Sequence, residues 1–478
     1  MTKIDRENIG GALYERLSAY ASSGMIPMHV PGHKRNSGML GDELPYGVDV
    51  TELPGFDNLH DMRGVLRDTA ELAASLYGCT WAFPLVNGGT CGLLASVRAL
   101  TSRGDTVVMA RNCHMSVYSA VELCGLRPVY ITPETDADSG IARSVNPESV
   151  AGAIADNPGC ALVIITSPTY EGVVSDVAAI AEAAHSRSIP LLVDAAHGAH
   201  LGFSDYFPAQ AIREGADAAV VSLHKTLPAL TQCALALARG PLVEPGALRR
   251  ELAVFQTSSP SYVLLASIDR CLRLLASRGK EMFDALEGRL RRFDARIASL
   301  GRLRAIRRGN GAAGGAPGFY GFDPGKIVVS ARGAGLTGRE LAELLRAEFR
   351  IETEMAAADY VVAVATVCDE EWYLDALADA LLAIDARAPS ALPASGARAR
   401  VRGGPEDGEL AALGDAVGAV AAEHIRAYPP GTPIIAAGEV ISEDAMREIR
   451  RLAAAGVTLQ GLPGALRGDG KTRKRRSD

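Results

Sequence analysis

The sequence predicts an α/β protein: a large domain built on a mostly parallel sheet, followed by smaller α/β units at its C-terminal end. Two observations support this prediction. The middle of the chain alternates short apolar runs with amphipathic stretches, which is typical of βα units with a buried sheet. In addition, only 5% of the residues are aromatic and 50 of 478 are glycine, a composition that fits an α/β protein better than an all-β one.

Six apolar runs are expected to form the strands of the large sheet, because each is bounded by Gly, Pro or polar residues and helical patterns fill several of the gaps. Residues 11–22 before these runs and residues 262–300 after them have the spacing of helices. The six runs are Thr106–Ala110, Pro128–Ile131, Ala161–Thr166, Pro190–Asp194, Ala218–Ser222 and Ala234–Ala238.

The C-terminal part of the chain predicts two further units. In the first, Lys326–Ser330 and Val361–Ala365 have the pattern of strands, and Gly338–Phe349 and Glu370–Ile384 that of helices. The last unit has helical patterns near 409–427 and 442–455. We therefore expect an N-terminal arm (1–45), a large domain (46–270), a small α/β domain (271–388), a linker (389–408), a C-terminal domain (409–465) and a basic disordered tail (466–478).

Composition excludes several classes of function. The formal net charge is -7, which argues against a nucleic-acid-binding protein, since such a protein needs a basic face. The apolar runs are short and interrupted, and the first ten residues are polar and charged, so we expect no membrane span, no signal peptide and a cytoplasmic location. None of the eight cysteines forms a CxxC pair or a zinc-like cluster, and no metal site is expected.

Two strand ends carry the residues that point most directly to chemistry. Lys225 follows the strand that ends near Ser222, and Asp194 ends an earlier strand. Ligands of open parallel sheets bind outside the carboxyl ends of strands, where a lysine can form a Schiff base with a carbonyl cofactor. A carboxylate there can keep a pyridine nitrogen protonated. A lone lysine or aspartate would more often be a surface or capping residue, but this order and spacing indicate a pyridoxal 5'-phosphate (PLP) enzyme of fold type I.

Two further motifs lie in the order that such a site requires. Asn87-Gly88-Gly89-Thr90-Cys91 precedes an apolar helical pattern, and the backbone amides of such a glycine-rich helix start can bind a phosphate. His114 follows the strand Thr106–Ala110, where its imidazole could stack on a cofactor ring. Each motif alone is weak, since glycine-rich turns and structural histidines are common. Together with Asp194 and Lys225, they favour the functional interpretation.

At this point the chain resembles the ornithine/lysine/arginine decarboxylases, which have a PLP-dependent transferase-like large domain. The resemblance covers about residues 8–463. Within the family, the chain is similar to the short form, which lacks an N-terminal receiver-like domain. The matching segments are Pro27–Lys34, Asp49–Gly55, Asn87–Thr90, Arg111–His114, Ser167–Gly172, His197–His200, Ser222–Lys225, Gln256–Tyr262, Tyr428–Pro433 and Gly438-Glu439.

The resemblance implies a role for each matching position. Lys225 would form the Schiff base, Asp194 would pair with the pyridine nitrogen, and His114 would stack on the ring. The implied cofactor-binding set is Gly89, Thr90, Cys91, His114, Asp194, Ala196, His197, Ser222, His224 and Lys225. Gly89 stands where the family commonly has Ser or Thr, which would cost one phosphate hydrogen bond. The segment Gln256–Tyr262 would reach a neighbouring subunit's site, which implies a homodimer or a larger assembly.

Three functions remain open at this level. The first is α-decarboxylation of arginine, lysine or ornithine, with arginine slightly favoured, giving CO2 and a polyamine precursor. The second is another fold type I reaction, such as transamination or elimination, which would need an arginine of the small domain to clamp the substrate carboxylate. The third is a catalytically inactive decarboxylase-like regulator. Asp49, Glu52 and Glu354 are candidates for binding the distal cation of a basic substrate, although each could equally be an ordinary cap or surface ion pair.

Overall fold

The computed structural model describes residues 12–24, Pro31, His33, Lys34, Asn36, Met39, 44–137, 139–306, 318–387, 416–428 and 431–462. The linker and the basic tail of the sequence analysis lie outside these residues, as does most of the N-terminal arm. Within the part described, no helix combines the length and apolar character needed to cross a membrane.

The large domain contains a seven-stranded sheet in the order β1-β8-β7-β6-β4-β2-β3, in which β8 alone runs against its neighbours. The strands are β1 (Trp81–Leu85), β2 (Thr106–Ala110), β3 (Arg127–Ile131), β4 (Cys160–Thr166), β6 (Leu191–Asp194), β7 (Ala218–Val221) and β8 (Ala234–Ala238). This arrangement confirms the predicted mostly parallel sheet. All six predicted strands are present, and the strand that the sequence analysis missed is β1.

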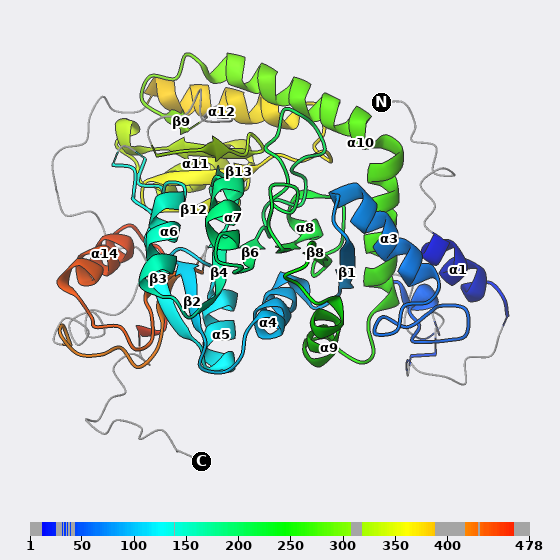
Figure 1. Cartoon of the computed structure of the whole chain (residues 1–478). Helices are drawn as coiled ribbons and strands as arrows, with labels where there is room; N and C mark the ends of the chain where they lie inside the picture. The colour runs from blue at the N-terminus through cyan, green and yellow to red at the C-terminus, as the bar shows by residue number, and fades with distance from the viewer. Residues whose placement is uncertain are drawn as a thin grey trace.

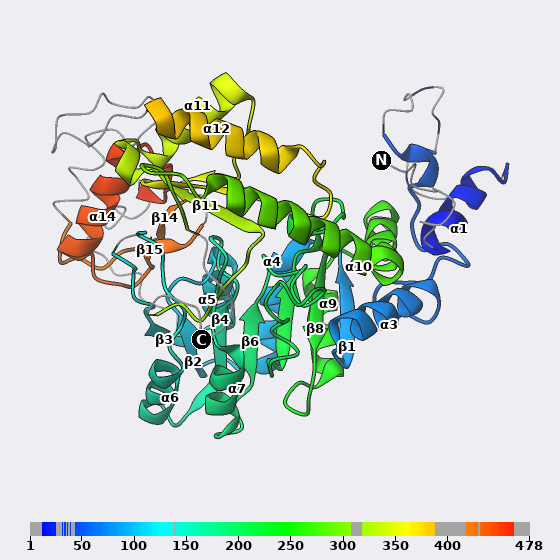
Figure 2. The same ribbon diagram turned by 90° about the horizontal axis from the view of Figure 1, so that it is seen from above.

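Helices cover both faces of this sheet. Helices α4 (Gly88–Leu100), α5 (Met115–Cys124) and α9 (Pro245–Phe255) pack on one face, and α6 (Pro147–Asp156) and α7 (Val177–His185) pack on the other (Figure 2). This division is what right-handed crossovers between parallel strands require. Because both faces are covered, the central strands are buried along their whole length.

One long helix connects the large domain to the small one. Helix α10 (Tyr262–Ile297) begins beside α3 (Val65–Tyr77) and α1 (Ala12–Ala21) and ends beside α12 (Tyr373–Arg387) (Figure 1). Buried apolar residues recur with the helical period along the whole of α10. One face of the helix therefore packs against both domains. The helix therefore ties together elements that are far apart in the sequence.

Two smaller sheets follow. The small domain has a four-stranded antiparallel sheet in the order β12-β13-β11-β9, and the C-terminal unit has a three-stranded sheet in the order β15-β14-β16. The short pair β10–β5 joins Gly321–Phe322 to Val173–Val174 of the large domain. The other elements are η2 (Tyr46–Val48), α8 (Leu223–Thr226), β9 (Arg304–Ile306), β11 (Lys326–Ser330), η3 (Arg332–Ala334), α11 (Gly338–Phe349), β12 (Met355–Ala356), β13 (Tyr360–Val364), β14 (Ile425–Ala427), β15 (Pro433–Ile435), α14 (Glu443–Ala454) and β16 (Leu459–Gln460).

The helix expected near 409–427 is wrong over residues 416–427, which form turns and strand β14; residues 409–415 lie outside the described part. Gly418 has a φ of +90°, which no helix accommodates. Ile425 is buried because β14 pairs with β15 and β16. The C-terminal unit lies at one end of the molecule and α1 at the other (Figures 1 and 2).

Candidate active site

A cavity of about 680 Å³ opens at the carboxyl ends of the parallel strands. Residues of the large domain, the small domain and the C-terminal unit all contribute to its wall. Strand β4 reaches it at Thr166, β6 at Asp194 and β7 through the following residue, Ser222. The cavity therefore lies where open α/β sheets bind their ligands.

Asp194 and Lys225 both line this cavity. Asp194 is the last residue of β6 and its side chain is buried, with Oδ1 accepting a hydrogen bond from the Ala196 backbone N–H at 3.1 Å. Lys225 stands on the short helix α8, directly after β7. Burial lowers the pKa of Lys225 below its ordinary value, although Asp194 and Glu354 act in the opposite direction. A lysine with a lowered pKa is a better nucleophile near neutral pH.

His114 is held in one orientation at the start of α5. Its Nδ1 accepts a hydrogen bond from the Ser116 backbone N–H at 3.2 Å and lies 2.8 Å from the Ser116 hydroxyl. Burial lowers the pKa of His114; Asp194 opposes this effect, and the charges of Lys225 and Arg426 add to it. The ring is therefore neutral with its proton on Nε2. Gly431 of the C-terminal unit packs against that edge of the ring.

The start of α4 forms one end of the cavity. Asn87 precedes this helix without a capping side-chain hydrogen bond, so the first backbone N–H groups are not satisfied by a cap. Gly89 and Thr90 line the cavity, whereas Cys91 is buried beneath it with its thiol against the Gly88 carbonyl. This end of the cavity has the backbone arrangement that binds anions.

Gly89 makes room for a neighbouring hydroxyl. A Cβ at this position would lie 2.8 Å from Ser222 Oγ, so the serine occupies the space that a side chain would need. His224 donates through Nδ1 to the Cys233 carbonyl at 3.0 Å, which leaves Nε2 for another partner. The cradle of α4 amides, Ser222 and His224 fits a phosphate, and the buried Asp194 carboxylate fits a pyridinium. The residues present thus match the chemistry of PLP.

The cavity wall contains one carboxylate from each of the large domain, the small domain and the C-terminal unit. Glu171, Glu354 and Glu448 line the cavity. Glu171 accepts a hydrogen bond from Tyr360, Glu354 accepts one from Tyr170, and Glu448 is paired with Arg451. Within the described residues, no arginine or lysine forms an ion pair with Glu354. The sequence analysis considered Glu354 but missed Glu448, which no local pattern distinguishes from other helix-surface acids.

Asp49 and Glu52 do not line this cavity within the same chain. Asp49 Oδ2 lies 3.1 Å from His33 Nε2. One carboxylate oxygen of Glu52 is buried without a hydrogen-bond partner among the described residues. These two acids are therefore separated from the third candidate, Glu354.

His197 lines the cavity, and the buried Lys326 lies behind it. The His197 ring lies between two lysines, with Nε2 3.0 Å from Lys225 Nζ and Nδ1 2.9 Å from Lys326 Nζ. The sequence analysis did not identify Lys326 as a site residue. It could have been noticed as a lysine at the start of an apolar strand, Lys326–Ser330, whose residues are all buried.

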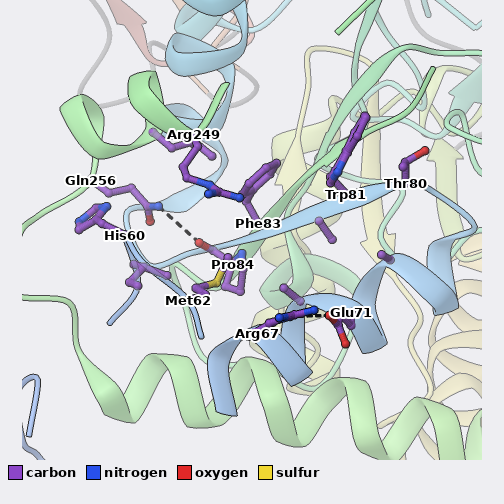
Figure 3. Close-up of a pocket in the computed structure, with 15 residues that line it drawn as sticks. His60, Met62, Arg67, Glu71, Thr80, Trp81, Phe83, Pro84, Arg249 and Gln256 are labelled. Carbon is purple, nitrogen blue, oxygen red and sulfur yellow. Dashed lines mark hydrogen bonds and ion pairs between the residues drawn. The ribbon is translucent and has the colours of Figure 1, made fainter. Parts of the chain in front are cut away.

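The segment Gln256–Tyr262 begins at the edge of the large sheet that β1 forms, where Gln256 lines a second cavity of about 350 Å³ (Figure 3). The Gln256 side chain accepts a hydrogen bond from Val86 N at 3.0 Å and donates to Pro84 O at 3.4 Å, so it covers the free edge of β1. Residues 257–259 are exposed. An ion pair between Arg67 and Glu71 lies on the α3 side of this second cavity.

Arg111 joins the C-terminal unit to the large domain. Its guanidinium forms two hydrogen bonds with the Glu439 carboxylate, Nε to Oε1 at 3.1 Å and Nη2 to Oε2 at 2.8 Å. It also donates to the carbonyls of Pro433 and Ile434 at 2.8 and 3.1 Å. Because Pro433 and Ile434 line the main cavity, the hydrogen bonds of Arg111 fix the position of the cavity wall that these two residues form.

Comparison with known proteins identifies the family. Residues 11–334 match the family model described as Orn/Lys/Arg decarboxylase, major domain, and residues 382–468 match the model of the C-terminal domain of the same family. The chain is 32% identical over 470 residues to an arginine decarboxylase of Bacillus subtilis, which covers 94% of this chain and 95% of the relative. It is 30% identical over 469 residues to an arginine decarboxylase of Halalkalibacterium halodurans, covering 94% of each.

Solved structures support the same fold. The lysine decarboxylase of Francisella novicida superposes with a TM-score of 0.76 at 16% identity, covering 95% of this chain and 79% of that one. At this identity the likeness establishes the fold, and the family models and the arginine decarboxylases establish the membership. The chain belongs to the Orn/Lys/Arg decarboxylase family, whose members are PLP-dependent carboxy-lyases.

Proposed function

We propose that this protein removes the α-carboxylate of a basic amino acid, with arginine as the favoured substrate, and that it uses PLP bound at Lys225. The observation that carries this proposal is the division of the cavity: Lys225 and Asp194 stand at the strand ends, and carboxylates stand on the wall that the small domain and C-terminal unit contribute. A basic amino acid has a reactive end and a cationic end, which such a cavity can bind separately.

We assign the cofactor contacts as follows. The amides of Gly89, Thr90 and Cys91, with Ser222 and His224, would hold the phosphate, and Asp194 would hold the pyridine nitrogen in its protonated form. His114 and Ala196 would enclose the two faces of the ring, with His197 beside it. When bound, PLP supplies a carbonyl carbon for an amine and an electron sink for the bond broken at Cα.

The residues of this chain would do the rest of the work by positioning and proton transfer. Lys225 would hold the cofactor and then give up its place to the substrate amine. The neutral His114, with its proton on Nε2, is suited to donate a hydrogen bond near the ring face. The C-terminal unit covers the cavity through Pro433 and Ile434, which would exclude water from the carboxylate that leaves as CO2.

Glu354 is the acid that we propose for the distal cation, because it lines the cavity and forms no ion pair within 4.0 Å with an arginine or lysine among the described residues. Two similar proteins carry the name arginine decarboxylase, which supports a guanidinium as that cation. Among the described residues, the cavity lining includes no arginine, so it lends no support to transamination with a carboxylate clamp in the small domain.

We also propose that the active species is a homodimer or a larger assembly. Residues 257–259 are exposed next to the free edge of β1, and Asp49 and Glu52 lie outside the cavity of their own chain. This is consistent with the idea that the segment Gln256–Tyr262 acts at the site of a neighbouring subunit.

The test of function uses the purified PLP-loaded protein with arginine, lysine and ornithine separately, and product masses are measured. We expect CO2 and agmatine from arginine, with a higher kcat/KM than for the other two. Glu354→Gln should raise KM for arginine about tenfold while changing kcat much less, because it removes one charge-assisted contact. Glu352→Gln, at an exposed acid paired with Arg346, is the matched control. Absence of decarboxylation of all three substrates would refute the proposal.

A further inference from the structure

His197 connects two lysines that belong to different domains. Its Nε2 lies 3.0 Å from Nζ of Lys225 in the large domain, and its Nδ1 lies 2.9 Å from Nζ of Lys326 in the small domain. His197 is 8% exposed and Lys326 is 1% exposed, so protein groups rather than solvent surround most of this chain of three. One imidazole ring thus links the amine at the cofactor site to a buried amine behind it.

The number of protons in this arrangement is restricted. Burial and the charges of Lys326 and Lys225 hold the pKa of His197 well below its ordinary 6.5, so the ring is neutral near pH 7. A neutral imidazole has one N–H and one lone pair, whereas an ammonium can only donate. The lysine that faces the N–H must therefore accept, and to accept it must be an uncharged amine. Only one of the two lysines can be an ammonium while both contacts are kept.

The surroundings favour the charge on Lys326. Burial lowers the pKa of Lys326 to about 8, with the carboxylates of Asp323 and Glu354 acting against this effect, so at pH 7 this lysine is mainly an ammonium. Its Nζ also lies 5.6 Å from the centre of the Tyr170 ring, a contact that favours a cation.

For Lys225, burial likewise lowers the pKa, and Asp194 and Glu354 oppose this effect. Of the two lysines, only Lys326 lies over an aromatic ring among the described residues. The charged and titratable groups that face the three residues from the surrounding elements are His114, Glu171, Asp194, His200, His224, Asp323 and Glu354, together with the Tyr170 ring. Of these, His200 forms a hydrogen bond with Asp323, with 3.0 Å between Nε2 and Oδ1.

We propose that Lys326 is a positioning residue: its ammonium donates to Nδ1 of His197, turns the Nε2–H toward Lys225, and so holds Lys225 as the neutral amine that attaches PLP. In this attachment the Lys225 lone pair forms a bond to the aldehyde carbon, and the aldehyde oxygen leaves as water with both amine hydrogens. An ammonium has no lone pair for this step. The inference rests on the proposed function in one respect, that Lys225 is the residue that binds PLP.

Removing the charge at position 326 should release this constraint. In Lys326→Met, Nδ1 of His197 loses its donor, the ring can place its proton on Nδ1, and Lys225 can then donate to Nε2 as an ammonium. The repulsion between two nearby like charges also disappears. We expect the pKa that governs PLP attachment at Lys225 to rise by about 1–2 units. Lys326→Arg keeps a permanent cation and should keep the wild-type profile.

The experiment measures the rate at which PLP reattaches to the full-length protein after its removal. Visible absorbance of the lysine-bound cofactor is followed between pH 6 and pH 10 for wild type, Lys326→Met and Lys326→Arg. The matched control is Lys280→Met, which removes an exposed lysine paired with Asp284. Lys326→Met should be slower by about tenfold or more at pH 7 and equal to wild type near pH 10. The other two variants should follow wild type at every pH.

A second measurement needs no cofactor. The rate at which acetic anhydride acylates Lys225 is determined by peptide mass spectrometry in the PLP-free protein, and its pH midpoint should rise by the same amount in Lys326→Met. If that variant does not fold, Lys326→Leu, which likewise removes the donor and the charge, should show the same upward shift.

Four outcomes would each mark a failure, and they can be distinguished. An unchanged pH midpoint in Lys326→Met would overturn the role of Lys326, and so would a slowing by the same factor at every pH, which indicates only structural damage. Loss of the wild-type profile in Lys326→Arg would also count against the role of the charge. If the wild-type protein does not attach PLP at Lys225, the proposed function itself fails.

Discussion

Arg111 should hold the C-terminal unit against the large domain, and its removal should loosen this unit and open one wall of the cavity. The guanidinium makes two hydrogen bonds to Glu439 and two to the carbonyls of Pro433 and Ile434. The Arg111 side chain is 15% exposed and that of Glu439 is 30% exposed, so the ion pair is only partly screened by water. The perturbation that we choose is Arg111→Met combined with Glu439→Gln.

The expected magnitude follows from this partial burial. Removing one partner of a buried ion pair costs about 3–5 kcal/mol, whereas an exposed pair is worth about 0–1 kcal/mol. The pair between Arg111 and Glu439 lies between these limits and has bidentate geometry. We therefore expect a coupling energy of about 1.5–3 kcal/mol between the two residues.

The assay is a double-mutant cycle on the free energy of unfolding in urea, with kcat/KM measured on the same four proteins. Arg67 and Glu71 form an exposed pair on α3, with side chains 64% and 62% exposed, and provide the control cycle. Their coupling should be about 0.3–0.5 kcal/mol. A coupling between Arg111 and Glu439 as small as that of the control, with KM unchanged in Arg111→Met, would refute the docking role.

The other predictions concern cofactor attachment, the phosphate cradle, a loop and the assembly. Lys225→Ala should abolish both turnover and the visible band of bound PLP, and a variant that keeps both would show that another residue attaches the cofactor. Gly89→Ser should weaken PLP binding about tenfold, because the new side chain meets Ser222 Oγ, and Gly89→Ser with Ser222→Gly should recover most of it in a Kd titration. Asp57 accepts hydrogen bonds from four backbone N–H groups; burial alone would raise its pKa, but these bonds prevail and the pKa lies below the ordinary 3.8. Asp57→Asn should therefore cost about 1 kcal/mol of unfolding free energy at pH 7, a difference that is lost as the pH falls below 3.8 through the folded-state pKa; equal losses at pH 7 and pH 2 in thermal melts would contradict this. Light scattering should give a dimer or larger for the active protein, and an active monomer would exclude the proposed role of residues 257–259.

The strands of the large sheet could be predicted because each is a short apolar run with clear boundaries. Strand β1 was missed because Pro84 interrupts its pattern, and proline cannot donate to a sheet. The structure explains why it is tolerated: β1 is an edge strand, and the Pro84 carbonyl accepts from the Gln256 side chain. The false helix near 409–427 came from alanine-rich composition, which Gly418 and the pairing of β14 override.

Sequence alone determined the family resemblance and the strand ends that carry Asp194, Lys225 and His114, because strand-end motifs are local and their order along the chain is informative. Only the tertiary structure decided which acids face the cavity and that Lys326 lies 2.9 Å from His197. Lys326 and His197 are 129 residues apart in the chain, and Glu448 reaches the same cavity from the C-terminal unit. No local pattern encodes such a contact, because it depends on how the large domain, the small domain and the C-terminal unit pack around one cavity.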